Sequence, residues 1–233
     1  LGRNFTFIAM GSMGAALLGL ALVFAFEIES ISRSVSRDYA ILYSNELVGD
    51  LESRLGREIA ISVKTASSPV IQDWFMDEDN PRLQSVAARE LSSVVKVFQG
   101  RDLFLATTAS RNFRFISQGS EPDLRSVSGV LDPANPDDQW FFMSLELEGD
   151  YHLNVDTDRF IKTTRIWINA PARREGKVIG VLGTGLYLEP LIGSVMFEHR
   201  GVKAKSIVIN SFGAIQLDQD TDNIKENSYA PGP

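Results

Sequence analysis

Residues 163–170 are the stretch of this chain whose residue types are best suited to bind a small molecule. The sequence TTRIWINA alternates, so in an extended strand Arg165, Trp167 and Asn169 point to one side and Ile166 and Ile168 to the other. A cation, a large aromatic ring and an amide are groups that fix the orientation of a ligand, whereas the apolar face is suited to a core. The alternative is a half-exposed strand on which Arg165 only pairs with a neighbouring carboxylate.

An acidic segment precedes this strand. Residues 132–159 contain eight acids and one base. We expect residues 151–157 and 162–170 to form a hairpin in which Asn154 lies opposite Arg165, with Asp156 as its diagonal neighbour. Arg165 is the predicted carboxylate or phosphate anchor, because its planar guanidinium binds such groups through two hydrogen bonds. The alternative is an internal ion pair between Arg165 and Asp156.

The predicted ligand-binding set combines this strand face with aromatic and polar residues that precede it. Trp140 is expected to be an apolar wall or a cation-binding face, with a core side chain as the alternative. Tyr151 is the weaker aromatic candidate, because it could simply face solvent. The full set is Trp140, Tyr151, Asn154, Asp156, Arg165, Trp167 and Asn169.

The sequence lacks the residues that several kinds of chemistry require. The chain has no cysteine, which excludes disulfides, cysteine-based zinc sites and thiol nucleophiles. The formal net charge of -7 argues against nucleic-acid binding. Residues 218–222 imitate the start of a calcium loop, but Asn223 and Tyr229 replace its glycine and its final glutamate. We therefore predict no catalytic residue, no metal ligand and no cofactor.

Residues 5–26 form an uncharged run of 22 residues. A helix rising about 1.5 Å per residue would carry this run across a hydrocarbon core of about 30 Å, so we predict a transmembrane helix. The run exceeds the apolar part of a cleaved signal peptide, which is the alternative. Arg3 precedes it and Glu27 and Glu29 follow it. This charge bias favours residues 1–4 as a cytoplasmic stub and the rest outside a bacterial inner membrane, in the periplasm or the extracellular space.

Residues 27–65 carry apolar side chains mostly three or four apart and contain no proline. This pattern predicts one long membrane-proximal helix. Such a helix needs something packed along its apolar stripe, either a sheet of its own domain or a second copy of itself. We expect both in different turns, with a parallel homodimer around residues 28–42.

Residues 66–201 are predicted to form one membrane-distal α+β module. Helices are expected at residues 70–76 and 81–98, the second ended by Gly100. The glycines of residues 177–187, KVIGVLGTGLY, predict a bulge or a place where a ligand or another backbone approaches closely. Residues 188–199 return to a helical period. Strands are expected at residues 103–108, 113–118, 151–157, 162–170 and 177–187.

Residues 202–233 begin another strand pair, which we interpret as the start of a second, truncated module. Because the chain starts with Leu1 and ends soon after this run, we interpret it as a piece of a longer protein whose output module is missing. That output module could be an enzyme, whereas the fragment itself is not expected to be one.

The order of these parts resembles a known family. A membrane helix, a long helix, two strands, the loop segment NPDDQWF at residues 135–141, a hairpin and then VIGVLGTGL are similar to the extracytoplasmic Cache (PAS-like) sensor domains of bacterial transmembrane receptors, in the double-Cache arrangement. The resemblance covers residues 27–217. It implies an antiparallel sheet on the long helix and a ligand pocket between the far face of the sheet and the loops. It also implies a receptor such as a chemoreceptor, histidine kinase or diguanylate cyclase.

The sequence departs from the amino-acid-binding members of that family. Their Arg-x-Trp-Tyr-x-x-Ala motif falls on Asp138, Trp140, Phe141 and Ser144, so an aspartate replaces the arginine that holds the ligand carboxylate. The aspartate that holds the α-amino group in those members falls at about Gly185. Both ends of that clamp are absent, and an α-amino acid bound in that manner is not expected.

The leading hypothesis is a ligand-sensing input domain of a membrane-anchored receptor. It would bind a small polar organic molecule, including one that bears a carboxylate, and relay the signal through the long helix. The alternative is a ligand-independent dimerisation or partner-binding module. An extracytoplasmic enzyme is the third hypothesis, but it rests only on acidic residues that turns explain equally well.

Overall fold

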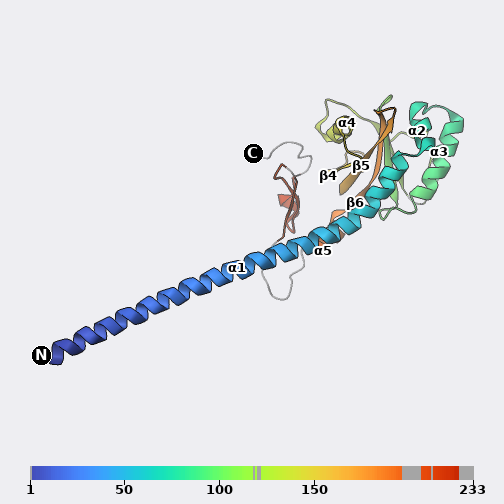
Figure 1. Ribbon diagram of the computed structural model, residues 1–233. Helices are drawn as coiled ribbons and strands as arrows, with labels where there is room; N and C mark the ends of the chain where they lie inside the picture. Colours follow the sequence, from blue (N-terminus) through green and yellow to red (C-terminus); the bar gives the residue numbers. More distant parts are fainter. Residues whose placement is uncertain (1, 118, 120–121, 196–205, 211, 226–233) are drawn as a thin grey trace. The chain divides into compact units, whose positions relative to one another are not determined.

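The computed structural model describes residues 2–117, 119, 122–195, 206–210 and 212–225. Contacts within the chain separate two units, Leu1–Gly49 and Asp50–Pro233. Helix α1, Gly2–Ala66, supplies the described part of the first unit and continues into the second. The second unit also contains a curled antiparallel sheet (Figure 1), so the predicted α+β class is confirmed.

A six-stranded sheet forms the centre of the second unit, with the strand order β3-β2-β1-β6-β5-β4. All its neighbouring strands are antiparallel. The sequence predicted five of the strands to within a few residues, but β5 continues beyond its predicted end. The bounds are β1 Asp102–Thr107, β2 Asn112–Ser117, β3 Gly129–Val130, β4 His152–Thr157, β5 Thr164–Arg174 and β6 Lys177–Tyr187.

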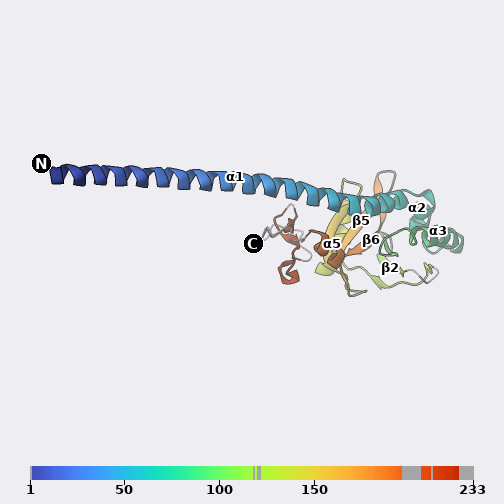
Figure 2. The same cartoon turned by 90° about the horizontal axis from the view of Figure 1, so that it is seen from below.

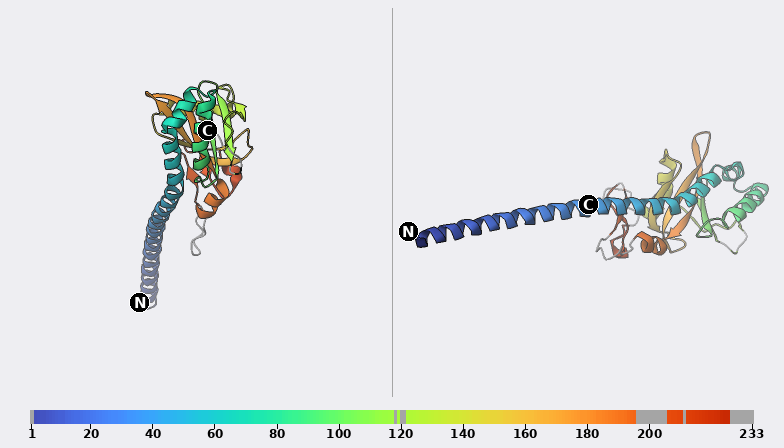
Figure 3. Two further views of the ribbon diagram at one scale, coloured as in Figure 1. Left: turned by 90° about the vertical axis from the view of Figure 1, so that its right-hand side faces the viewer. Right: turned by 60° about the horizontal axis from the view of Figure 1, so that its bottom comes forward.

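Helices cover one face of this sheet. Leu51, Leu55 and Ile59 of α1 pack in a cluster with Ile166 and Ile168 of β5. The other helices on this face are α2, Pro69–Met76, and α3, Pro81–Val94, which lie beside each other (Figures 2 and 3). The predicted packing of a sheet against this part of the long helix is confirmed.

Helix α3 begins as the sequence predicts but ends early. Asn80 caps its first turn by accepting from the backbone N–H of Arg82 at 3.1 Å, and proline follows at the first helical position. The helix stops at Val94 rather than near Gly100. Gly100 has a different role, because a Cβ atom there would lie 2.9 Å from the backbone oxygen of Gly185. It permits close packing against β6.

The opposite face of the sheet is covered by a short helical segment that the sequence did not predict. It consists of the 3-10 turn η1, Pro136–Asp138, and helix α4, Gln139–Glu146. Figure 1 shows α4 on the far side of the sheet from α2 and α3. Trp140 and Phe141 of α4 pack in a cluster with Phe104, whereas the adjacent Leu103 and Leu105 pack toward the other face.

The described residues after β6 form four short elements. Helix α5, Leu188–Val195, contributes Leu188 and Leu191 to the cluster around Ile168. Strands β7, Val208–Ile209, and β8, Ile215–Leu217, pair with each other, and η2, Thr221–Asn223, follows. The predicted strand pair at the C-terminus is confirmed. The last part of the helix predicted for residues 188–199 lies outside the described residues.

The glycines of β6 allow close approach, as predicted. A Cβ atom on Gly183 would lie 1.7 Å from the backbone oxygen of Ile168 on the neighbouring strand. A Cβ atom on Gly185 would lie 2.6 Å from side-chain atoms of both Arg165 and Trp167. The second glycine therefore makes room for the two largest side chains on one face of β5.

The burial of β5 yields a stability prediction. Ile168 is fully buried, and its cross-strand partner Leu153 on the edge strand is 39% exposed. Ile168→Ala should lower the free energy of unfolding by roughly 2–5 kcal/mol, because it empties a buried site that cannot fully collapse. The matched Leu153→Ala variant should lose clearly less. Denaturant unfolding of both variants tests this, and equal losses would contradict the difference in burial between the two residues.

Candidate ligand-binding site

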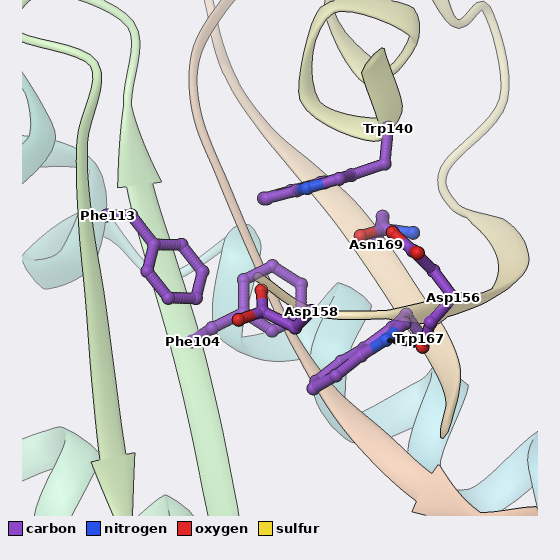
Figure 4. Close-up of a pocket in the computed structure, with 7 residues that line it drawn as sticks. All are labelled: Phe104, Phe113, Trp140, Asp156, Asp158, Trp167 and Asn169. Atoms are coloured by element: carbon purple, nitrogen blue, oxygen red, sulfur yellow. Dashed lines mark hydrogen bonds between the residues drawn. The ribbon is translucent and has the colours of Figure 1, made fainter. Parts of the chain in front are cut away.

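A small cavity lies on the sheet face that α4 covers (Figure 4). Its enclosed volume is about 10 Å³, room for about one water molecule and far below the roughly 300–1,000 Å³ of most ligand pockets. An organic ligand can therefore enter only if the walls separate. The lining residues come from β1, β2, α4, β4, β5 and the β4–β5 turn. They are Phe104, Phe113, Trp140, Asp156, Asp158, Trp167 and Asn169.

Four aromatic rings from four elements form the walls. The ring centroid of Phe104 lies 5.2 Å from Trp140 and 5.8 Å from Trp167, both in edge-on geometry. Phe113 stacks on Phe104 at 6.1 Å and meets Trp140 at 6.2 Å. Aromatic pairs at these separations stabilise one another beyond the burial of their surfaces. In this form the walls therefore close the cavity by contacting one another.

The polar groups of the cavity come from β4, β5 and the turn between them. Asn169 is 1% exposed, and its Nδ2 donates to Asn154 Oδ1 at 2.7 Å, whereas its Oδ1 has no hydrogen-bond partner. Figure 4 shows this side chain between the indoles of Trp140 and Trp167, with its oxygen toward Phe113. The result is a buried acceptor that faces an aromatic space.

Asp158 begins the β4–β5 turn and also lines the cavity. Its Oδ1 accepts from the backbone N–H groups of Phe160 at 2.8 Å and Ile161 at 2.9 Å. Burial raises the pKa of the Asp158 carboxyl, these hydrogen bonds oppose the rise, and the charge of Asp138 adds to it. A positive charge near this carboxyl would favour its ionised form.

An ion pair joins the β4–β5 turn to η1, directly before the helix that carries Trp140. Arg159 donates to both carboxylate oxygens of Asp138 at 2.7 Å, and Asp138 is 1% exposed. Asp138 also accepts from the backbone N–H of Asp132 at 2.8 Å. The aspartate that replaces the family's carboxylate-binding arginine is thus occupied within the protein.

Arg165, the predicted anchor, does not line the cavity. Its Nη1 donates to Asp102 Oδ2 at 2.5 Å, and both side chains are 5% exposed. Its Nη2 donates to the hydroxyl of Tyr187 at 3.0 Å, and the guanidinium lies 4.3 Å from the Tyr187 ring centroid. Burial raises the pKa of the Asp102 carboxyl, and the hydrogen bond and charge of Arg165 oppose that rise. The internal pair expected as an alternative exists, but with Asp102 rather than Asp156.

The hairpin register differs from the predicted one. Asp156 lies opposite Arg165, and Asn154 lies opposite Trp167. The cause is the turn, which begins at Asp158 and ends only when Thr164 pairs with Thr157. Lys162 adopts a left-handed backbone conformation and donates to the Asp158 backbone oxygen at 2.8 Å. The longer turn shifts every pair by two residues.

Four of the seven predicted site residues meet at the cavity: Trp140, Asp156, Trp167 and Asn169. Asn154 is not part of the lining, but its Oδ1 accepts a hydrogen bond from Asn169. Tyr151 is 41% exposed and also lies outside the lining. Sequence reasoning missed three lining residues. The local sequence pattern predicted only that Phe104 and Phe113 lie in strands and that Asp158 lies in a turn.

His152 supports the site from the edge strand. Its Nε2 lies 3.3 Å from Asn169 Nδ2 and its Nδ1 lies 3.2 Å from Ser144 Oγ, so Nε2 accepts and Nδ1 carries the proton. The Ser144 hydroxyl then donates to the backbone oxygen of Trp140 at 2.7 Å. Burial lowers the pKa of His152 to about 4. A neutral imidazole thus joins Asn169 to the helix that carries Trp140.

No protein-family model matches the sequence, but solved structures share the fold. The ligand-binding domain of the Pseudomonas aeruginosa PAO1 amino acid chemoreceptor PctB, in complex with L-Gln, has a TM-score of 0.58 at 18% identity, over 82% of this chain and 72% of that domain. The ligand-binding domain of the Pseudomonas fluorescens chemoreceptor CtaA, in complex with L-alanine, has a TM-score of 0.53 at 17% identity, over 80% and 73%.

A third similar structure comes from another class of receptor. The sensor domain of the V. cholerae histidine kinase DctB has a TM-score of 0.55 at 11% identity. It is matched over 78% of this chain, which spans 66% of the DctB domain. The chain therefore has the fold of the Cache-type sensor domains of bacterial receptors. The resemblance stated from the sequence is confirmed at the level of the fold.

The Arg165–Asp102 pair yields a prediction with an internal control. Arg165→Ala should lower the free energy of unfolding by roughly 3–5 kcal/mol, because it leaves the Asp102 carboxylate buried and unpaired. Arg174→Ala removes the ion pair with Asp73, whose side chains are 45% and 48% exposed. That loss should be roughly 0–1 kcal/mol. Denaturant unfolding distinguishes them, and a loss for Arg165→Ala no larger than for Arg174→Ala would contradict a structural role.

Proposed function

We propose that this chain is the ligand-sensing input part of a membrane-anchored signal-transduction receptor, with its sheet domain outside the membrane. The observation that carries the proposal is the cavity, which places buried polar groups inside aromatic walls on a Cache-type fold. The similar solved domains belong to chemoreceptors and a histidine kinase, and two of them are in complex with amino acids.

The membrane part of the proposal rests on α1. Among the described residues, α1 is the one helix long and apolar enough to cross a membrane. Residues 5–26 carry no charge. In the proposal they cross a bacterial inner membrane, and the cavity lies in the periplasm or the extracellular space.

The proposed relay runs from the cavity to α1 through buried charges. Arg165 lies two residues from Trp167 on the same strand face, and its partner Asp102 begins β1. Just before β1, the backbone N–H of Gln99 donates at 3.0 Å to Glu58, a side chain of α1 that is 1% exposed. A ligand can shift α1 through these contacts only if it binds two arrangements of them with different affinity.

Calorimetric titration of the full chain in nanodiscs tests the binding part. The panel should contain carboxylates, amines, amino acids and purines. We expect at least one compound to bind, and Trp140→Ala to weaken that binding about tenfold or more, a loss of about 1.4 kcal/mol. Met143→Ala is the matched control, since Met143 belongs to the same helix but is 38% exposed and outside the lining. No binding across the panel would favour the dimerisation module instead.

The first unit carries an apolar stripe that supports a parallel homodimer. Ile28, Ile31, Val35 and Leu42 are between 60% and 70% exposed. Their spacing of three, four and seven residues places them on one face of a helix. We propose that a second copy of this chain covers this face near the membrane.

Cysteine cross-linking tests the dimer without background, because the chain has no cysteine of its own. Ile31→Cys and Val35→Cys should form disulfide-linked dimers readily in membranes. Arg33→Cys and Arg37→Cys, on other faces of the same turns, should form them at least several-fold less. Cross-linking with no helical period across these positions would contradict the dimer.

A further inference from the structure

The charge of the cavity lining is one-sided. Two of the seven lining residues, Asp156 and Asp158, are acids, and none of the seven is a base. Two arginines next to lining residues in the sequence form ion pairs elsewhere, since Arg165 pairs with Asp102 and Arg159 binds Asp138 through both carboxylate oxygens. Among the described lining residues, a ligand carboxylate would meet two acids and no cation, whereas a ligand cation would meet complementary charge.

The walls favour a cation for a second reason. Phe104, Phe113, Trp140 and Trp167 surround the space, and the face of an aromatic ring carries partial negative charge. A cation within about 6 Å of such a ring gains roughly 0.5–2 kcal/mol, with the larger values in desolvated sites. Trp167 is held in place for this role, because its Nε1 donates to the backbone oxygen of Asp156 at 3.0 Å.

Asn169 distinguishes between kinds of cation. Its Oδ1 is a buried acceptor with no partner, because its Nδ2 is turned to Asn154 and His152. Leaving a buried acceptor unsatisfied costs roughly 1–3 kcal/mol, and a ligand N–H would remove that cost. A quaternary ammonium ion has no N–H and cannot do so. The unpartnered oxygen is independent of the acidic residues and points to the same class of ligand.

We infer that the cavity, after its walls separate, binds a small organic ammonium ion with at least one N–H. The nitrogen lies near Asp156, Asp158 and Asn169, and the carbon part lies against the aromatic walls. This inference rests on the proposed function and names the ligand class of the same site. It also distinguishes the ligand from the L-alanine and L-Gln of the similar domains. The positions matching the family's amino-acid clamp, Asp138 and Gly185, present no cation and no acid to the cavity.

The test is calorimetry on the full chain in nanodiscs with matched probes. The ammonium series runs from methylammonium to hexylammonium and includes phenethylammonium, so that size alone does not decide the result. The controls for charge are the carboxylates and alcohols of the same chain lengths. Tetramethylammonium is the control for the N–H, and the γ-amino acid of the butyl chain adds a carboxylate. We expect at least one primary ammonium ion to bind more tightly than every control.

Three variants locate the binding. Asp156→Asn and Asp158→Asn remove a charge and keep the shape, and the amide introduced by Asp158→Asn would retain an oxygen that accepts from Phe160 and Ile161. Each should weaken ammonium binding about tenfold or more, or at least about 1.4 kcal/mol. Asp137→Asn, an exposed acid outside the lining, should leave it unchanged. Melting temperatures of all three confirm that a loss of binding is not a loss of folding.

The outcomes separate the inference from the proposed function. If only carboxylates, alcohols or amino acids bind, and Trp140→Ala weakens them, the sensor proposal stands and the ammonium inference is wrong. If tetramethylammonium binds as tightly as the primary ions, the role of Asn169 is wrong. If ammonium ions bind equally well to Asp156→Asn, Asp158→Asn and Asp137→Asn, they do not bind in this cavity. If no compound of either panel binds, both proposals fall.

Discussion

A buried ion pair between Arg165 of β5 and Asp102 of β1 constrains the arrangement of this domain. The two strands are not neighbours, because β6 lies between them. The pair can form across β6 only because Gly185 has no side chain, since a Cβ atom there would lie 2.6 Å from atoms of Arg165 and Trp167. Two charges that are 5% exposed are costly to separate, so this contact holds the side chains of β5 and β1 together across β6.

The ion pair also decides which chemistry remains for the cavity. Arg165 and Trp167 point to the same side of β5, yet the guanidinium turns to Asp102 and only the indole reaches the cavity. Arg159 is likewise taken by Asp138. These two arginines therefore stabilise the sheet and the segment before α4, and the charged residues among the described lining are both acids. On this face of β5, Arg165 therefore stabilises the fold and Trp167 lines the cavity.

Local patterns predicted much of this fold from the sequence. The alternation of residues 163–170, the proline after Asn80 and the glycines of β6 each reflect short-range constraints, and each prediction agrees with the structure. The register of the β4–β5 hairpin failed because the turn includes six residues rather than four, a choice made by the Asp158 cap and the left-handed Lys162. The partner of Arg165 lies 63 residues away, and no local pattern in either segment indicates that they meet. Phe104 and Phe113 lie in a local hairpin, and the long-range pairing of β1 with β6 brings that hairpin to the site.

A double-mutant cycle on Asp102 and Arg165 tests the central claim most directly. Free energies of unfolding are measured for Asp102→Ala, Arg165→Ala and the double variant in the full chain. If the two side chains form a buried pair, the double variant should lose less stability than the sum of the single variants, by at least about 1 kcal/mol, because removing both leaves no stranded charge. Losses that add to within about 0.5 kcal/mol would show that the residues act independently. That result would contradict the structural role of Arg165 and make its guanidinium available as a ligand anchor.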